Sequence, residues 1–107
     1  MSNSNNSAEP LDLDLAYRLL LGSRNRAGMP PPAPLDEVWR NRLDAAIIEI
    51  ESRGIKLDNN IDDLMLAADY ASYLLDCREK GGGMPDWLRF RLSQRWISQY
   101  KRAGDGA

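Results

Sequence analysis

Apolar residues recur every three to four positions in four segments of the chain, and polar or Gly/Pro-rich stretches separate these segments. This period is typical of amphipathic helices. No segment shows a sustained alternation of apolar and polar residues, so strands are not expected beyond residues 54–57. The pattern therefore predicts an all-α fold, a small bundle of three to four helices.

The chain begins with a segment, residues 1–10, that is rich in Asn and Ser and has no apolar period, so we expect a disordered tail there. A short helix is predicted from Asp12 to about Leu21. Asp12 or Asp14 can cap its start, and Gly22 can end it. A helix of this length is marginal alone and must pack on another element to be ordered.

Four prolines mark the linker that follows the short helix, so residues 11–34 form a short helix plus a proline-rich linker. Consecutive prolines favour extended polyproline II structure and exclude helix. The spacing of Pro31 and Pro34 fits a ligand of a proline-binding module. A stiff spacer is the simpler interpretation, because the run is short and few basic residues flank it.

Two longer helices are predicted at 36–53 and 61–80. The first begins at Asp36 or at Pro34-Leu35 and ends at Gly54, with Ile55 placed to pack back on the helix, as in a Schellman motif. The second follows Asn60, a plausible N-cap. Its apolar residues cover more than one face, which is typical of a helix that is buried centrally or shared between a core and a partner.

A fourth helix is predicted at 85–101, after a glycine-rich hinge at 81–83, with Pro85 in its first turn. Residues 35–103 would thus form the main helical domain. Eight apolar residues on these three helices are expected in the core: Ile47, Ile50, Leu64, Ala68, Ala71, Leu75, Leu88 and Leu92.

Composition limits the class of protein. The chain has 107 residues, enough for one domain, with 28% charged residues and a formal net charge of −2. Its single cysteine cannot form an internal disulfide, and no signal peptide or membrane-spanning stretch is apparent. We therefore expect synthesis in the cytoplasm and no membrane partner.

Catalytic and metal-binding patterns are missing from the sequence. Histidine is absent, which removes the usual general base and zinc ligand, and Cys77 without a histidine is a poor nucleophile. The segment 58–69 imitates a calcium loop but has Asp63 where glycine is needed and Asp69 where a bidentate glutamate is needed. We expect no enzyme activity, no cofactor and no metal.

The C-terminal segment 85–107 is basic, since it holds five Lys/Arg and two Asp, a balance of +3. Arg91 and Arg95 share one helix face and should form an exposed guanidinium edge beside an apolar one. Three interpretations stay open: phosphate contact with base stacking, a solvated basic face, or contact with an acidic protein surface.

Aromatic residues are numerous for so short a chain, and a small helical domain cannot hide them all. Trp, Tyr and Arg are the residues that are enriched at interfaces. The candidate interaction residues are therefore Trp39, Trp87, Arg89, Arg91, Arg95, Trp96 and Tyr100.

The order of these segments resembles a known family. The helix that ends in Ile50-Glu51-Ser52-Arg53-Gly54-Ile55, the acidic start Ile61-Asp62-Asp63-Leu64, the run Ala68-Asp69-Tyr70-Ala71 with Arg78 after it, and Met84-Pro85-Asp86-Trp87-Leu88-Arg89 follow one another. In this order residues 35–97 resemble the head–tail connector proteins of tailed bacteriophages, also called adaptor or head-completion proteins. Residues 1–34 lie outside the resemblance.

This resemblance implies a structural virion protein that forms a ring of identical subunits under the portal. The ring extends the DNA channel and joins head to tail by contacting the next connector or tail protein, with non-specific DNA contact in the channel possible. The location would be the head–tail interface of the virion, after assembly in the host cytoplasm. The alternative is a small helical nucleic-acid-binding accessory protein that uses the basic C-terminal helix.

Overall fold

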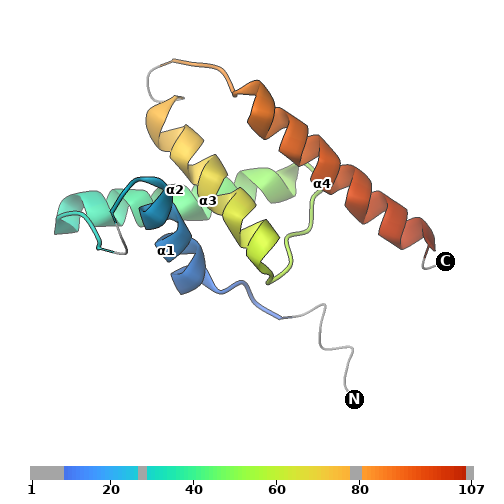
Figure 1. The fold of residues 1–107 in the computed structure, drawn as a ribbon, viewed down its shortest axis with the longest axis horizontal. Helices are drawn as coiled ribbons and strands as arrows, with labels where there is room; N and C mark the ends of the chain where they lie inside the picture. Colours follow the sequence, from blue (N-terminus) through green and yellow to red (C-terminus); the bar gives the residue numbers. More distant parts are fainter. Residues whose placement is uncertain (1–8, 27–28, 78–80, 106–107) are drawn as a thin grey trace.

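The computed structural model describes residues 9–26, 29–77 and 81–105, and this part of the chain contains four helices and no strand. The helices are α1 (Leu13–Ser23), α2 (Ala33–Ser52), α3 (Ile61–Asp76) and α4 (Asp86–Asp105). Figure 1 shows α3 between α1 and α4, with α2 running across them. The predicted all-α fold is confirmed, and residues 54–57 form no strand.

Helix α3 is the centre of the molecule and contacts each of the other three helices. Nine of its 16 residues are buried. Among them, the small Ala67, Ala68 and Ala71 let neighbouring helices approach closely, because side-chain size at the contact sets the distance between helix axes. Most of the broad apolar surface of this helix therefore packs against the other three helices.

Six of the eight predicted core residues are buried: Ile50, Leu64, Ala68, Ala71, Leu88 and Leu92. The prediction is wrong for Ile47 and Leu75, which are only partly buried. Leu75 lies in the last turn of α3, and Ile47 borders a groove between α1 and α2.

Helix α1 is an integral part of the core, although the sequence predicted only a short helix that is marginally stable alone. Its Ala16, Tyr17, Leu20 and Leu21 are all buried. At the end of the helix, Arg24 bonds both carboxylate oxygens of Asp76 at 2.8 Å. The described residues of α1 therefore pack together with the main helical domain.

The helix ends follow the local sequence. As predicted, Asp12 caps α1 by accepting a hydrogen bond from the N–H of Leu15 at 3.1 Å, and Asn60 caps α3 through the N–H of Asp63 at 2.9 Å. These bonds satisfy amide groups that the first helical turn leaves unpaired.

Some boundaries differ from the prediction. Helix α2 begins at Ala33 rather than residue 36, so the expectation that prolines exclude helix up to residue 34 is wrong there. Pro34 lies in the first turn, where its missing N–H removes no helical hydrogen bond. Helix α4 continues past Gly104. The predictions for residues 1–8 and 78–80 lie outside the described residues.

Candidate functional site

Helix α4 has an inner face that is bound to α3 by apolar contacts and two ion pairs. Leu88 and Leu92 are buried in the core. Arg91 pairs with Asp69 of α3, and Arg95 pairs with Asp63 of the same helix. The two arginines therefore hold α4 in place.

Arg95 forms the more buried pair. Its side chain is 12% exposed and that of Asp63 is 4% exposed. The Arg95 guanidinium also donates to the carbonyl of Lys56 at 2.7 Å. The hydrogen bond to Asp63 raises the pKa of Arg95 above its usual value, followed by the charges of Asp63 and Asp58, against the lowering effect of burial.

The prediction that Arg91 and Arg95 form an exposed guanidinium edge is therefore wrong. Arg95 is mostly buried and Arg91 is partly buried, and each forms an ion pair with an aspartate of α3. Arg89 is exposed and pairs with Asp86 one turn earlier in α4. Sequence alone placed Arg91 and Arg95 on one helix face correctly, but it could not show that this face meets two aspartates.

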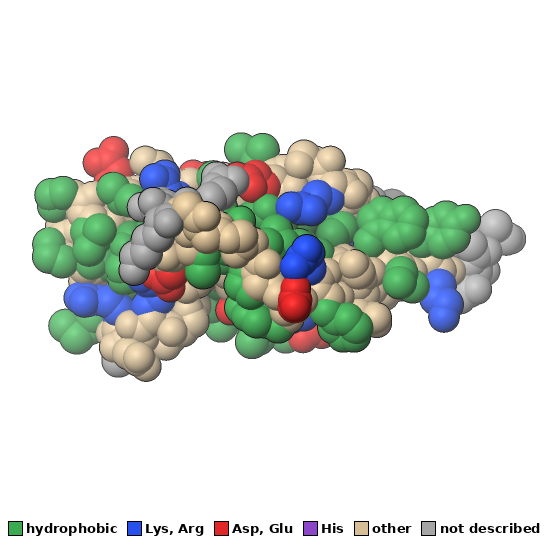
Figure 2. Space-filling view, turned by 90° about the horizontal axis from the view of Figure 1, so that it is seen from above, with side chains coloured by type: hydrophobic (Ala, Val, Ile, Leu, Met, Phe, Trp, Pro, Cys, Tyr) green, Lys and Arg blue, Asp and Glu red, His purple; other side chains and the backbone are tan. Residues whose placement is uncertain are grey.

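The outer face of α4 is a large exposed apolar surface. Its five members are 44–68% exposed: Trp87, Phe90, Trp96, Ile97 and Tyr100. The rings of Trp96 and Tyr100 are stacked, with centroids 5.5 Å apart and planes within 5°. Hydrophobic side chains gather along this part of α4 toward its C-terminal end (Figure 2). Contiguous exposed apolar patches are typical of interaction sites, so the outer face of α4 is the candidate site.

Trp39 does not belong to any such surface, although the sequence made it an interaction candidate. Its side chain is 7% exposed and packs in the core. The guanidinium of Arg24 lies over its ring, 4.8 Å from the centroid. Trp39 of α2 therefore belongs to the core and contacts Arg24 at the end of α1.

A second apolar surface, which sequence reasoning missed, lies between the start of α1 and the middle of α2. Here a groove of about 530 Å³, the α1–α2 groove, is lined by Pro10, Leu11, Leu13, Asp44, Ile47 and Ile48. Ile48 is 67% exposed and Leu13 is 45% exposed. The exposed Ile48 within the otherwise regular apolar period of α2 is the signal that could have located it.

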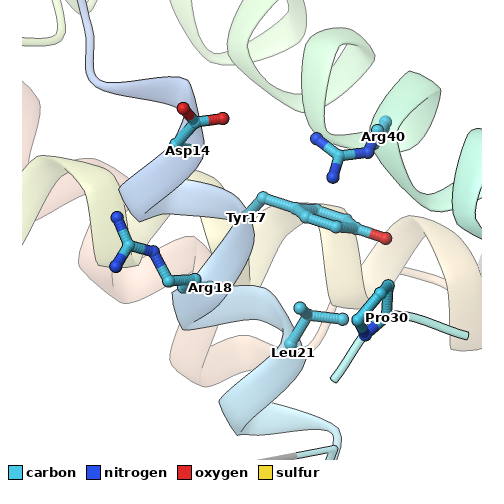
Figure 3. Close-up of a pocket in the computed structure, with 6 residues that line it drawn as sticks. All are labelled: Asp14, Tyr17, Arg18, Leu21, Pro30 and Arg40. Atoms are coloured by element: carbon cyan, nitrogen blue, oxygen red, sulfur yellow. The ribbon is translucent and has the colours of Figure 1, made fainter. Parts of the chain in front are cut away.

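A polar pocket of about 320 Å³ surrounds Tyr17, where α1 and α2 meet (Figure 3). The Tyr17 hydroxyl donates a hydrogen bond to Asp36, and the Arg40 guanidinium lies 4.0 Å from the centroid of the Tyr17 ring. Arg40 also pairs with Asp36 at 3.0 Å. These groups satisfy one another, so the pocket is a structural contact between helices.

The pKa values in this pocket follow from the same contacts. Burial raises the pKa of Tyr17 to about 12, and the hydrogen bond to Asp36 adds to the effect. The hydrogen bond from Tyr17, followed by the contacts of Arg40, lowers the pKa of Asp36. A tyrosine that holds its proton so firmly does not act as a general base at neutral pH.

The described residues contain no cluster of carboxylate or cysteine side chains that could hold a metal ion. Cys77 is partly buried at the end of α3. No helix among the described residues is long and apolar enough to cross a bilayer.

No protein-family model, no curated protein and no solved structure matches this chain.

Proposed function

We propose that this chain is a head–tail connector of a tailed bacteriophage, a structural protein that forms a ring under the portal and joins head to tail. The resemblance of residues 35–97 to that family suggests the role. The observation that supports it in the fold is the outer face of α4, where five large apolar side chains lie exposed. A helix of this kind needs a protein partner to remove that surface from water.

The way in which α4 is fixed also supports assembly. Its polar anchors, Arg91 and Arg95, are turned toward α3, so the apolar side chains are left facing outward on a helix that is already held. A preorganised surface loses less conformational entropy on binding than a mobile one. In the proposed ring this face contacts a neighbouring subunit, the portal, or the next connector or tail protein.

The alternative, a nucleic-acid-binding accessory protein, depends on the basic residues of α4. Carboxylates of α3 neutralise Arg91 and Arg95, two of the five basic residues of α4. Counterion release scales with the number of cations that reach phosphates, so this pairing weakens the case for DNA binding.

The test is co-expression of the full chain with the portal protein encoded in the same genome, followed by size-exclusion chromatography and electron microscopy. We expect a complex in which the chain adds a ring below the portal. Phe90→Asp should abolish this complex and Val38→Asp, on an unrelated face, should preserve it. A gel-shift titration at two salt concentrations tests the alternative. Failure to bind the portal, together with tight salt-dependent DNA binding by a monomer, would overturn the connector proposal.

A further inference from the structure

We infer that two copies of this chain pair through the outer faces of their α4 helices, which lie antiparallel in a two-fold dimer. This pairing concerns the isolated chain and does not rest on the proposed function. Because the dimer covers the outer face of α4, the two copies would have to separate before that face contacts a portal or another partner protein.

A stripe of residues runs along the outer face of α4 at spacings of three or four positions, which place side chains on one face of a helix. Its members, the α4 stripe, are all exposed: Asp86, Phe90, Ser93, Ile97 and Lys101. Phe90 and Ile97 are 63% and 44% exposed, and the small Ser93 lies between them. A small residue at a helix contact lets the two axes approach closely. Figure 1 shows α4 at the edge of the molecule, so a second helix can reach this stripe.

The α4 stripe has a two-fold pattern about its midpoint. Phe90 and Ile97 are equally far from the point between residues 93 and 94, and so are Asp86 and Lys101. When a second α4 lies antiparallel across this midpoint, Phe90 of each copy faces Ile97 of the other. Asp86 of each copy then faces Lys101 of the other. Such a contact uses the same surface of both subunits, as a two-fold dimer requires.

The charges at the two ends of the α4 stripe select the antiparallel direction. An antiparallel pair brings the carboxylate of Asp86 to the ammonium of Lys101 at both ends, whereas a parallel pair brings like charges together at both ends. Asp86 also accepts a hydrogen bond from Arg89 of its own helix, through Oδ1 at 2.5 Å. Because the Asp86 side chain is 94% exposed, its Oδ2 stays accessible to a second cation.

The charged groups beside the α4 stripe are compatible with this contact. By helical spacing, Arg89 lies on the side of the stripe that carries Trp96, and Lys101 lies on the other side. In an antiparallel two-fold pair each side meets its own equivalent, so Arg89 of one copy faces Trp96 of the other and not Lys101. Asp62 of α3 lines a cleft with Gln94 on the Lys101 side, where its carboxylate adds negative charge.

Two exposed cations that precede α3, Arg53 and Lys56, lie outside the proposed contact. Gln99 is on the face of α4 opposite the α4 stripe. There it accepts the backbone N–H of Lys56 at 2.6 Å and donates to the carbonyl of Gly54 at 2.8 Å. Arg53 donates to the hydroxyl of Tyr70 in α3 at 3.3 Å. These contacts keep both residues on the inner side of α4.

Charge reversal at the ends of the α4 stripe tests the contact. Asp86→Lys and Lys101→Asp each replace the two attractive pairs of the dimer by repulsive ones. Since exposed pairs contribute little individually, each variant should raise the dimer dissociation constant by about tenfold. The double variant Asp86→Lys/Lys101→Asp should return the constant to near that of the unmodified chain, because opposite charges face each other again.

The readout is sedimentation equilibrium of the full chain over a range of concentrations. Ile97→Asp places a carboxylate in the middle of the α4 stripe and should abolish the dimer, whereas Val38→Asp, on α2 and 38% exposed, is the matched control. Circular dichroism melts check that each variant folds, since Asp86→Lys also loses its pair with Arg89. The single and the double variant share that loss, so recovery by the double variant reports the contact between copies.

A chain that stays monomeric at every concentration would overturn the inference and leave the outer face of α4 to a partner protein. A dimer that the single charge reversals do not weaken, or that the double variant does not restore, would overturn the antiparallel contact. A dimer that forms as described but does not bind a portal would sustain this inference and defeat the connector proposal. Portal binding by a chain that is always monomeric would do the reverse.

Discussion

Arg95 and Asp63 are joined by a two-bonded ion pair, in which Nε lies 2.8 Å from Oδ1 and Nη2 lies 3.0 Å from Oδ2. Oδ2 of Asp63 also accepts the backbone N–H of Asp58 at 2.7 Å. This cluster ties α4 to α3 and to the segment that precedes α3. It is the main polar link between the helix that bears the exposed apolar face and the rest of the molecule.

The first prediction concerns this pair. Asp63→Ala leaves the mostly buried guanidinium of Arg95 with only the more distant carboxylate of Asp58, 3.4 Å from Nη2. Removal of one member of a buried pair costs about 3–5 kcal/mol. The free energy of unfolding from urea denaturation should fall by this amount. Arg95→Ala should have a similar effect.

Arg89→Ala is the control, because Arg89 pairs with Asp86 at the surface, where an ion pair contributes about 0–1 kcal/mol. The combined change of Arg91 and Arg95 to Glu should detach or unfold α4, because each new carboxylate would face an aspartate of α3. Full stability of Asp63→Ala would show that the pair contributes nothing.

The second prediction compares two adjacent leucines at the end of α3. Leu74 is 1% exposed, whereas Leu75 is only partly buried. Leu74→Ala should cost about 2–5 kcal/mol, as for other large-to-small changes in a core. Leu75→Ala should cost clearly less, because part of its surface already contacts water. Thermal and urea unfolding of both variants measures this order, and equal losses would contradict it.

Leu75 also illustrates what the sequence could predict. The apolar period located four helices, and six of the eight predicted core residues are buried, because burial of one helix face is imposed by the local spacing of apolar residues. It could not rank Leu74 above Leu75 in a helix that is apolar nearly all round. The ranking depends on where α1 and α2 pack, which is a property of the whole fold.

For the candidate site, the sequence predicted the exposed aromatic residues correctly and the arginines incorrectly. Trp87, Trp96 and Tyr100 are exposed, as expected for an interaction surface. Arg91 and Arg95 are not, because their partners Asp69 and Asp63 lie more than twenty residues earlier in the chain. A pairing between distant segments leaves no local periodic signal, so the arginines looked solvent-exposed.

The third prediction concerns alkaline pH. Tyr17 has a pKa of about 12 in the fold against 10.0 for the free side chain. Below pH 10 the hydroxyl keeps its proton in both the folded and the unfolded state, and its stabilising contribution is complete. Between pH 10 and pH 12 only the unfolded state releases this proton, so stability should fall as the pH rises.

Tyr17→Phe provides the comparison. The variant lacks the hydrogen bond to Asp36 and should be less stable than the unmodified chain at neutral pH. The difference in unfolding free energy should shrink as the pH rises toward 12, where Tyr17 ionises in the fold. A difference spectrum of tyrosine ionisation should show one fewer late-titrating group in Tyr17→Phe. Ionisation of Tyr17 near 10 would contradict the prediction.

The fourth prediction concerns two glycines that respond oppositely to the same substitution. Gly54, just after α2, has φ of +91°, and an added Cβ would lie 3.4 Å from Nε1 of Trp96. Side chains disfavour left-handed backbone by about 1–2 kcal/mol, so Gly54→Ala should destabilise the fold by roughly this amount.

Gly22 is the matched position. It lies within α1, is exposed, and has open space around an added Cβ. Alanine favours helix over glycine by about 0.8–1.0 kcal/mol, so Gly22→Ala should raise the unfolding free energy by up to this amount. The sign of the two changes, measured by urea denaturation under one set of conditions, separates backbone strain from helix propensity. Destabilisation by Gly22→Ala, or no effect of Gly54→Ala, would contradict the geometry at that helix end.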